Sequence, residues 1–580
     1  MRIALAQINP VSGDISGNTA RILDVIGAAA AARADVVAVP EMALTGYCIG
    51  DLVEDASFLA ANERAIQAIA AGARGITAIV GFVDVDPGAR NDNGTIRKYN
   101  AAAVVRDGRI LQRARKSLLP NYRYFDDKRF FTPGERRDPV DVASSAGCVR
   151  IGVSICEDMW DEFYDIKPLA ELSAKGAGVL FNLNASPYSP GKRHIREGLL
   201  RGHIRSLGKP IAYVNTVGAA DNGKNIIPFD GESLVYDAEG RLIAIGKQFE
   251  EDLLIVEVGP GGPPQPALEL PPDDRARETH DALVMALRDY MRKTGFVRAI
   301  VPLSGGIDSA LALSIAADAL GPSQVSAYNL PSGYNTEATK SIAAAVASSL
   351  GVHYGVIPIQ QIDETVRSVF ETHAHPIAQS LTKENLHARI RGLLMMAESN
   401  DTGALLISCG NETEIALGYA TLYGDMCGGL SLIGDLSKTD VYRLARYVNR
   451  RHGRTIIPED AFCIKPSAEL AADQCDPFDY SVVSPIVGEF VERQVSPDEL
   501  VAQFERHALD PARFCPDDNG QTVYDKYTPE TFRAIVYDAA RRMRRSVYKR
   551  LQGPPIVVVS DRAFGFDFRE TIINEWDGRP

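Results

Sequence analysis

Cysteine is sparse in this sequence, and its spacing excludes two common uses of the residue. The 580 residues contain eight cysteines, and no two of them form a Cys-x-x-Cys pair. Disulfide frameworks are typical of short, cysteine-rich secreted chains, and zinc modules need closely spaced ligand pairs. The sequence therefore predicts neither a disulfide-stabilised scaffold nor a zinc knuckle.

Long apolar runs are also absent. Charged residues such as Arg33 and Asp35 interrupt every Ala/Val-rich segment, so none approaches the roughly 18 apolar residues of a membrane span. The first ten residues lack the basic stretch followed by an apolar one that a secretory signal requires. We therefore expect a cytoplasmic protein with no membrane partner.

The overall composition is that of a folded globular protein. The chain has 62 Lys and Arg against 75 Asp and Glu, a formal charge of −13, 45% hydrophobic residues and 24% charged residues. These fractions exclude collagen-like, coiled-coil and disordered chains, and the length suggests about three domains or two large ones. The acidic balance disfavours an extended nucleic-acid-binding surface.

A segment rich in proline and glycine divides the chain. Residues 259–273 contain nine Gly or Pro among fifteen positions, a composition that suits neither a helix nor a central strand. We predict an N-terminal domain over residues 1–257, a linker over 258–274 and a second domain over 275–580.

The N-terminal part alternates short β-rich runs with helical segments, among them 19–33 and 56–73, which is typical of an α/β domain. Hairpin signals at 106–109 and 237–240 require antiparallel neighbours. We therefore expect mixed sheets and not a purely parallel doubly wound sheet.

The second part has the pattern of a parallel sheet with crossover helices. It predicts helices over 275–294, 309–320 and 337–350 and strands over 299–303, 324–330, 353–358 and 404–409. Ligands of such sheets bind beyond the carboxyl ends of the strands, and a glycine turn follows the first of these strands.

That turn, Ser304-Gly305-Gly306-Ile307-Asp308-Ser309, opens a helix, where free backbone N–H groups favour an anion. It is not a Walker A loop because no Gly-Lys-Ser/Thr follows. A carboxylate beside a phosphate needs a bridging cation, so Asp308 implies Mg²⁺. The alternative is a plain turn with a helix cap.

The loop resembles that of the N-type ATP pyrophosphatases, which split ATP into AMP and pyrophosphate while adenylating an acceptor. The rest of the domain is similar to the NAD synthetases of that group, in the segments 384–392, 410–414, 417–419, 423–425, 434–439 and 465–470. The resemblance implies a parallel-sheet α/β domain that binds ATP, Mg²⁺ and nicotinic acid adenine dinucleotide (deamido-NAD).

The same resemblance assigns residues by position. The ATP-binding set is Leu303, Ser304, Gly305, Gly306, Ile307, Asp308, Ser309, Cys409, Lys438 and Ser467. The deamido-NAD-binding set is Asn385, Glu414 and Lys549, and the Mg²⁺ ligands are Asp308 and Glu414. Two positions depart from the family pattern, since Cys409 replaces a usual Thr and Glu412 a common Lys.

In the N-terminal part, a strand over 149–155 delivers Cys156 to its carboxyl end, where we expect an exposed thiol that reaches a carbonyl carbon. Glu41 ends another strand, and Lys116 precedes an apolar segment. Taken singly, each of the three is more often structural.

In the order Glu, Lys, Cys they resemble the nitrilase-type carbon–nitrogen hydrolases over about residues 1–257. That family implies an αββα sandwich in which Glu41 is the general base, Cys156 forms an acyl-enzyme and Lys116 stabilises the developing oxyanion. Segments 119–122 and 184–188 are similar to glutaminase domains attached to NAD synthetases, which implies that Tyr122, Ser186 and Lys192 hold glutamine. Arg193 is an equally suitable partner for the glutamine carboxylate by residue type.

Together the two resemblances imply a glutamine-dependent amidation. The second domain would adenylate deamido-NAD with ATP, and the first would supply ammonia from L-glutamine. The family also implies a homo-oligomer, and the sequence leaves free ammonium open as a second donor.

Two other functions are weaker alternatives. A tRNA-modifying pyrophosphatase would use the basic helix around 541–550 as an RNA surface, but it would also need paired cysteines. A nucleotide sensor without turnover is disfavoured because the catalytic candidates are all present. His373 and His375 have no metal-binding partners nearby in the sequence and indicate a polar loop.

Overall fold

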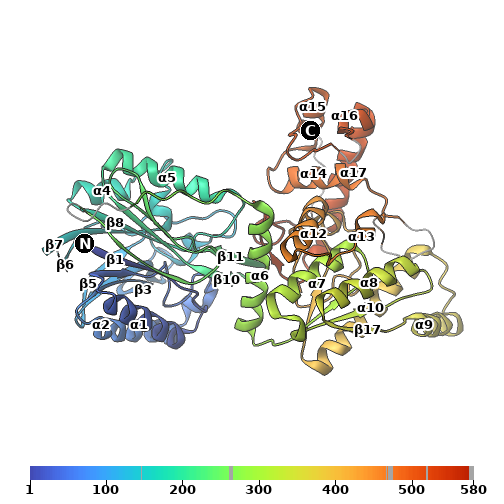
Figure 1. Cartoon of the computed structure of the whole chain (residues 1–580), viewed down its shortest axis with the longest axis horizontal. Helices are drawn as coiled ribbons and strands as arrows, with labels where there is room; N and C mark the ends of the chain where they lie inside the picture. Colours follow the sequence, from blue (N-terminus) through green and yellow to red (C-terminus); the bar gives the residue numbers. More distant parts are fainter. Residues whose placement is uncertain (146, 260–265, 466, 468–474, 517–519, 574–580) are drawn as a thin grey trace. The chain divides into compact units, whose positions relative to one another are not determined.

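The computed structural model describes residues 1–145, 147–259, 266–465, 467, 475–516 and 520–573 (Figure 1). The chain forms two compact units. The first comprises Met1–Asn222 with Ile227–Arg275, and the second comprises Gly223–Ile226 with Ala276–Pro580. Most of the linker predicted over 258–274 is described, but residues 260–265 lie outside the described part.

Two six-stranded mixed sheets form the first unit. The first sheet has the order β14-β1-β2-β3-β4-β5, with bounds β14 (Asp252–Glu257), β1 (Arg2–Gln7), β2 (Val36–Ala38), β3 (Thr77–Arg90), β4 (Ile96–Arg106) and β5 (Arg109–Arg115). The second has the order β13-β12-β9-β8-β7-β6, with bounds β13 (Leu242–Ile245), β12 (Leu234–Tyr236), β9 (Ile211–Asn215), β8 (Val179–Asn184), β7 (Gly147–Ile155) and β6 (Val140–Ser144).

Each sheet has three parallel strands at its centre and antiparallel strands at its edges. Strands β1, β2 and β3 are parallel, as are β7, β8 and β9. The predicted hairpins are present, since β4 pairs antiparallel with β5 and β12 pairs antiparallel with β13. The expectation of mixed sheets is confirmed.

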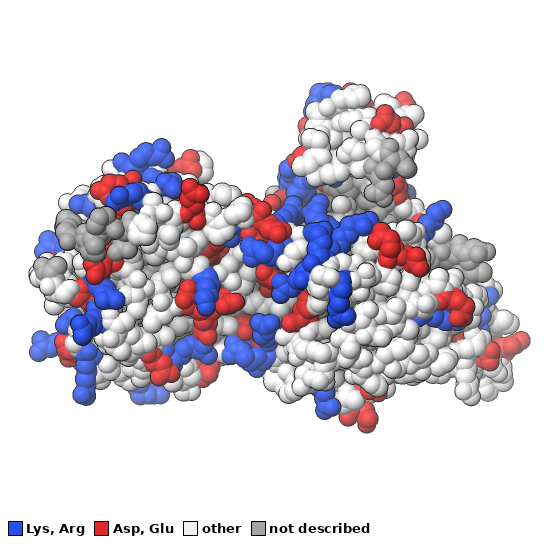
Figure 2. Space-filling view, in the orientation of Figure 1, with Lys and Arg blue, Asp and Glu red and all other residues white. Residues whose placement is uncertain are grey.

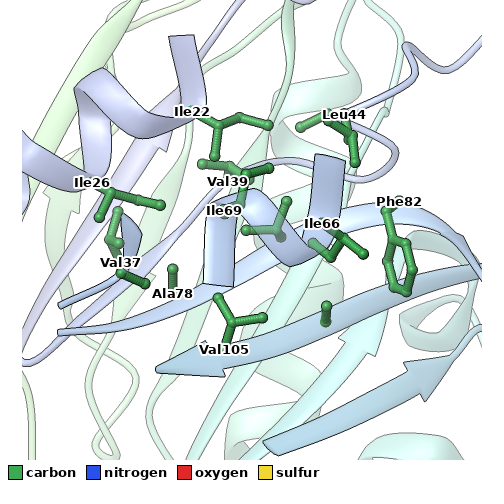
Figure 3. Packing of buried hydrophobic residues seen from close by; sticks show 14 of the residues in the cluster. Ile22, Ile26, Val37, Val39, Leu44, Ile66, Ile69, Ala78, Phe82 and Val105 are labelled. Carbon is green, nitrogen blue, oxygen red and sulfur yellow. The ribbon is translucent and has the colours of Figure 1, made fainter. Parts of the chain in front are cut away.

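Alternation along the strands explains the layering, because successive side chains point to opposite faces. In β1, Ile3 and Leu5 enter the core between the two sheets, while Ala4 and Ala6 enter the core under the helices. Helices α1 (Ile15–Ala31) and α2 (Ala56–Gly72) cover the first sheet. Figure 3 shows this packing, with side chains of both helices against Val37, Val39, Ala78 and Val105.

The second sheet is covered in the same way by α4 (Pro168–Ala174) and α5 (Lys192–Leu207). Their side chains pack on Leu180, Tyr213 and Tyr236 of the sheet. The first unit is therefore an αββα sandwich, as the family resemblance implied. Its remaining elements are η1 (Gly50–Glu54), α3 (Asp127–Phe130), η2 (Cys156–Met159), β10 (Val217–Asp221) and, from Ile227 onward, β11 (Asn225–Asp230).

A parallel sheet forms the centre of the second unit. Its order is β20-β19-β18-β15-β16-β17, with bounds β20 (Ile556–Val557), β19 (Leu430–Ser431), β18 (Leu405–Ser408), β15 (Ala299–Pro302), β16 (Val325–Asn329) and β17 (His353–Val356). Residues 225 and 226 pair with β20 and belong to this unit. The predicted α/β domain with a parallel sheet is confirmed.

Helices of the second unit pack on this sheet and on one another. Those in the first half are α6 (Arg275–Thr294), α7 (Ile307–Leu320), α8 (Glu337–Leu350), α9 (Gln360–His373), α10 (Ser380–Thr402) and α11 (Glu412–Leu417), with the short turn η3 (Pro322–Gln324). The others are α12 (Lys438–His452), α13 (Asp460–Cys463), α14 (Tyr480–Val491), α15 (Pro497–Glu505), α16 (Val523–Lys526) and α17 (Pro529–Arg550). An aromatic core, in which Phe504 stacks on Phe532 at 4.2 Å, joins α15 to α17.

Most predicted elements are found within a few residues of their expected bounds. The helices predicted over 275–294 and 337–350 match α6 and α8. The helix predicted from Thr19 begins earlier, at Ile15, because the Asp14 side chain accepts a hydrogen bond from Gly17 N and caps the first turn. The helix predicted from Ser309 begins at Ile307.

The charged surface is mixed. Figure 2 shows Lys and Arg interspersed with Asp and Glu, and blue side chains gather over α12. Two arginines of α12 are paired with carboxylates, Arg443 with Asp440 at 2.5 Å and Arg446 with Glu459 at 3.5 Å. Among the described helices, none combines the length and the apolar character needed to cross a membrane.

Candidate active sites

The first candidate site lies at strand ends of the sandwich. Lys116 directly follows β5, Cys156 directly follows β7, and Glu41 lies three residues after the end of β2. Lys116 Nζ donates to Glu41 Oε1 at 2.8 Å, and both side chains are fully buried. The fold therefore joins two of the three predicted residues directly, and both of their charges act on the third.

Cys156 is buried, with 5% of its surface exposed, which corrects the expectation of an exposed thiol. Burial raises the pKa of Cys156 well above its usual value, and the Glu41 charge adds to this effect while Lys116 opposes it. The resting group is thus a thiol, and a base must remove its proton before it can attack.

Both carboxylate oxygens of Glu41 are held in place. Oε1 also accepts a hydrogen bond from Asn100 Nδ2 at 2.7 Å, and Oε2 accepts one from Ala185 N at 2.8 Å. Ala185 lies in the loop after β8, next to Ser186. The loop that carries a predicted glutamine-binding residue therefore also fixes the predicted base.

Asp127 is a member of this site that the sequence analysis missed. Lys116 Nζ donates to Asp127 Oδ2 at 2.7 Å, and Tyr47 OH donates to Asp127 Oδ1 at 2.9 Å. Burial by itself lowers the pKa of Lys116, but Asp127 and Glu41 outweigh it and raise that pKa well above its usual value. Local sequence offered no signal, because Asp127 follows another aspartate, Asp126, on an ordinary polar turn.

Tyr122 and a second missed residue, Glu157, lie beside the thiol. Tyr122 OH donates to Glu157 Oε2 at 3.0 Å, and Tyr164 OH donates to Glu157 Oε1 at 3.1 Å. Burial raises the pKa of Glu157. Its position directly after Cys156 was the available signal, since a carboxylate next to a nucleophile suits a cationic substrate group.

Ser186 belongs to a buried polar network. Arg196 Nη2 donates to Ser186 O at 3.0 Å and to Ser186 Oγ at 3.2 Å, and Arg196 Nη1 binds both oxygens of Asp230. Arg196 was also not singled out from the sequence. Its burial, with 1% of its surface exposed, is a tertiary feature that helix periodicity does not identify.

The structure separates the two candidates for the glutamine carboxylate. Arg193 Nε binds Glu232 Oε1 at 2.6 Å, in a buried pair. Lys192 Nζ instead lies 5.5 Å from the ring centre of Trp160. Burial, together with the charges of Arg196 and Arg123, lowers the pKa of Lys192 to about 8. Lys192 is therefore the better candidate of the two.

The second candidate site begins at the glycine loop between β15 and α7. Gly305 has a φ of +91°, and a Cβ there would lie 2.0 Å from Thr339 O, so only glycine fits. Gly306 N donates to Ser304 Oγ at 3.1 Å, and Ser309 Oγ donates to Gly306 O at 3.0 Å.

Two apolar residues anchor this loop. Leu303 and Ile307 are both buried, and Leu303 O accepts a hydrogen bond from Asn329 Nδ2 at 2.7 Å. The side chains of these two residues therefore pack in the core at either end of the loop. The glycines and the serine hydroxyl groups determine the backbone conformation between them.

Lys438 and two carboxylates stand at the start of α7. Lys438 Nζ donates to Asp308 Oδ2 at 2.6 Å and to Glu414 Oε1 at 3.3 Å. Asn411 Nδ2 donates to Asp308 Oδ1 at 2.9 Å, and Asn411 caps the helix that carries Glu414. Three predicted residues from distant parts of the chain therefore meet in one ionic group.

The chemistry of these donors fits a magnesium ion. Burial raises the pKa of Glu414, Lys438 opposes this rise, and the Asp308 charge adds to it. A cation bound beside the two carboxylates would favour their charged form. Two carboxylates that reach one ammonium also reach one cation, and hard oxygen donors suit Mg²⁺. The described residues contain no cluster of three or more His, Cys, Asp or Glu that could hold a metal alone.

Cys409 and Ser467, the other two predicted ATP contacts, are both half-buried. Cys409 follows β18, and its thiol lies 3.8 Å from Pro302 O at the end of β15. Burial raises the pKa of Cys409, so it is an uncharged group beside the loop. Ser467 is half-buried, while its neighbours 466 and 468–474 in the predicted motif lie outside the described residues.

The predicted deamido-NAD contacts converge on the segment after α11. Asn385 Oδ1 accepts from Thr421 Oγ1 at 2.7 Å, and Lys549 Nζ donates to Gly418 O at 2.9 Å and Ala420 O at 2.8 Å. A cavity of about 20 Å³ includes Glu414, Ala420 and Asp425 in its lining. No hydrogen bond among the described residues joins Glu414 directly to Asn385 or Lys549.

Comparisons with known proteins identify a known family for each part of the chain. Residues 2–261 match the carbon-nitrogen hydrolase family, and residues 279–511 match the NAD synthase family. Glutamine-dependent NAD(+) synthetases of Thermotoga maritima and Synechocystis are each 36% identical to this chain. The alignments cover 99% of both chains for Thermotoga and 98% of both for Synechocystis.

Solved structures give the same result. The Acinetobacter baumannii glutamine-dependent NAD+ synthetase in complex with ADP is 32% identical, with a TM-score of 0.71 and coverage of 100% of this chain and 99% of that one. The Cytophaga hutchinsonii enzyme has a TM-score of 0.81 at 22% identity over 99% and 98% of the two chains, which supports the fold. The chain therefore belongs to the glutamine-dependent NAD(+) synthetase family, a family of ligases.

Proposed function

We propose that this enzyme converts deamido-NAD to NAD, using ATP and ammonia released from L-glutamine, with formation of AMP and pyrophosphate. The observation that carries the proposal is the presence, in one chain of this family, of two buried lysine–carboxylate groups. Lys116 with Glu41 lies among the residues around Cys156, and Lys438 with Asp308 lies at the phosphate loop. We also propose 1–257 and 275–580 as the two catalytic domains and a homo-oligomeric state.

The first site supports an acyl-transfer mechanism. Glu41 takes the proton of the Cys156 thiol, and the sulfur attacks the amide carbon of glutamine. Lys116 stabilises the oxyanion, and the proton passes from Glu41 to the leaving ammonia. Water activated by Glu41 then hydrolyses the thioester to glutamate, which restores the thiol.

Four side chains are proposed to hold the amino acid part of glutamine. Lys192 binds the carboxylate, and Glu157 accepts from the ammonium group. Tyr122 orients Glu157 through its 3.0 Å hydrogen bond, and Ser186 contributes a hydroxyl beside Arg196. One cation and one anion in the set match the two charges of the zwitterion.

The second site supports adenylation of the deamido-NAD carboxylate. The loop from Leu303 to Ser309 holds the ATP phosphates with its N–H groups, assisted by Lys438 and Ser467. Asp308 and Glu414 would hold Mg²⁺, which neutralises the charge that develops on the pyrophosphate. Asn385, Glu414 and Lys549 hold deamido-NAD. The carboxylate attacks the α-phosphorus, pyrophosphate leaves, and ammonia then displaces AMP.

The test is NAD formation from deamido-NAD, ATP and Mg²⁺, with glutamine or ammonium as donor, for the native enzyme and for Cys156→Ala. We expect the variant to lose only the glutamine-driven reaction, because ammonium enters at the second site. If the native enzyme forms no NAD with either donor, the acceptor is not deamido-NAD. If Cys156→Ala keeps the glutamine reaction, the thiol is not the nucleophile.

A further inference from the structure

Asp158 is a buried carboxylate that the mechanism above does not use. It lies in η2, two residues after the nucleophile, and only 3% of its surface is exposed. Oδ1 accepts hydrogen bonds from Ser117 N and Leu118 N, both at 2.9 Å, and Oδ2 accepts one from Ile155 N at 3.0 Å. One side chain thus receives three backbone N–H groups.

These donors flank the two reactive residues. Ser117 and Leu118 directly follow Lys116 at the end of β5, and Ile155 directly precedes Cys156 at the end of β7. Strand β5 belongs to the first sheet and β7 to the second. The Asp158 carboxylate therefore links the end of one sheet to the end of the other at the site.

The backbone between Ile155 and Asp158 needs such support. Cys156 has a φ of +41°, a left-handed conformation that is unfavourable for a non-glycine residue and persists only where the surrounding structure holds it. The bond from Ile155 N to Asp158 closes the turn around Cys156. The Asp158 carboxylate thus fixes the backbone on one side of Cys156. The same carboxylate also binds the backbone that directly follows Lys116.

We propose that Asp158 is a positioning residue of the glutamine-hydrolysing site, and that its carboxylate sets Cys156 at its working distance from Lys116. The inference rests on the proposed glutaminase function and adds to it a residue that touches neither glutamine nor the reacting atoms. Its role follows from the two backbone segments that it joins.

The key variant is Asp158→Asn, which has nearly the same size. The amide offers one acceptor oxygen in place of two, so either the Ser117–Leu118 pair or Ile155 N faces an NH₂ group. A misplacement of about 1 Å in such a site reduces turnover on the order of 100-fold. We therefore expect kcat for glutamine hydrolysis to fall about 100-fold, with KM for glutamine within about threefold of the native value.

A matched control is Asp35→Asn. The Asp35 carboxylate also bridges two segments through backbone N–H groups, from Arg2 at 2.8 Å and Ser145 at 2.7 Å. It has no contact with the three reactive residues among the described interactions. We expect kcat and KM for glutamine hydrolysis in this variant to stay within about twofold of native, whatever its loss of thermal stability.

Two further measurements separate positioning from general destabilisation. Iodoacetamide should label Cys156 about tenfold more slowly in Asp158→Asn at pH 7.5, because the thiol no longer faces its base, and at the native rate in Asp35→Asn. Asp158→Glu, which keeps both acceptor oxygens on a longer side chain, is the second variant if Asn at this position prevents folding. It should remain folded, with kcat lowered about tenfold.

The inference is overturned if Asp158→Asn keeps kcat within about threefold of native, or if Asp35→Asn loses as much kcat at an equal loss of thermal midpoint. It is also overturned if the loss in Asp158→Asn appears in KM alone. Native enzyme that hydrolyses no glutamine would instead contradict the proposed glutaminase function, so the two failures are distinguishable.

Discussion

Each unit of this chain holds a buried lysine between two carboxylates, but the two groups differ in access to solvent. In the first unit Lys116 bonds to Glu41 at 2.8 Å and Asp127 at 2.7 Å. Their side chains are 0% and 6% exposed. In the second unit Lys438 bonds to Asp308 at 2.6 Å and Glu414 at 3.3 Å, whose side chains are 18% and 20% exposed.

This difference in solvent exposure suits the two lysine–carboxylate groups to different roles. A fully enclosed lysine cannot exchange its partners without leaving a charge unpaired at high cost, so Lys116 is suited to a fixed electrostatic role beside a thiol. The more open carboxylates of the second site can pass from the lysine to an incoming cation, which would free Lys438 for phosphate. We infer that the first group is fixed and that the second is the arrangement present before a cation binds.

Removal of divalent cations should have the largest effect and should distinguish the two sites, since only the second is expected to need a metal. With excess EDTA we expect NAD formation to stop with either nitrogen donor, because Asp308 and Glu414 would repel the ATP phosphates without a bridging cation. Glutamine hydrolysis should continue at its native rate, since Lys116 and Cys156 need no metal. Parallel assays of NAD and glutamate check both, with Mg²⁺ added back as the control. Glutamine hydrolysis that needs Mg²⁺ would contradict the distinction.

Lys116→Met tests the enclosed group. The loss of the oxyanion partner should lower kcat for glutamine hydrolysis about 10³-fold. The variant also leaves Glu41 and Asp127 buried without a cation, which should destabilise the first unit by about 3–5 kcal/mol. Glutamate release and thermal unfolding measure the two effects. The ammonium-driven reaction should remain, and its loss would show that the enclosed lysine also supports the second unit.

Lys438→Met tests the open group and should have a smaller effect. We expect NAD formation with ammonium to fall about 10²-fold, since one charged contact to phosphate is lost. The Mg²⁺ concentration at half-maximal rate should decrease, because the cation no longer competes with an ammonium group for Asp308 and Glu414. A suitable control is Lys293→Met, which removes a lysine paired with Asp289 at 3.2 Å away from the loop. An increased Mg²⁺ requirement in Lys438→Met would contradict the exchange of partners.

Local pattern predicted much of the fold. Period-two alternation identified the strands, turn residues identified the hairpins, and the glycine loop marked the start of α7. Helix starts were less accurate where a side-chain cap decided them, as with Asp14. The burial of Cys156 could not be predicted, because it depends on how loops from both sheets of the sandwich pack around the strand end.

The candidate sites divide in the same way. Residues in compact motifs, such as Asp308 and Cys156, were available from the sequence. Asp127, Arg196 and Asp158 were not, because their roles arise only when segments distant in the chain meet in a buried network. The resemblance assigned Lys192, although Arg193 was equally suitable by residue type, and the pairing of Arg193 with Glu232 appears only in the structure.

Lys192 differs from Lys116 and Lys438, because its pKa is lowered and theirs are raised. Burial sets that pKa at about 8, so the side chain is charged below pH 8 and becomes neutral above it. If it binds the glutamine carboxylate, kcat/KM for glutamine should decrease a few-fold as the pH rises through about 8, while Lys116 keeps its charge.

Steady-state glutamine hydrolysis between pH 6.5 and 9.5 measures this decrease. Lys192→Met should lose the pH-dependent decrease and have a KM for glutamine about tenfold higher at pH 7. Arg205→Gln, on the last turn of the same helix, should keep the native profile. A pH step that persists in Lys192→Met would assign it to another group.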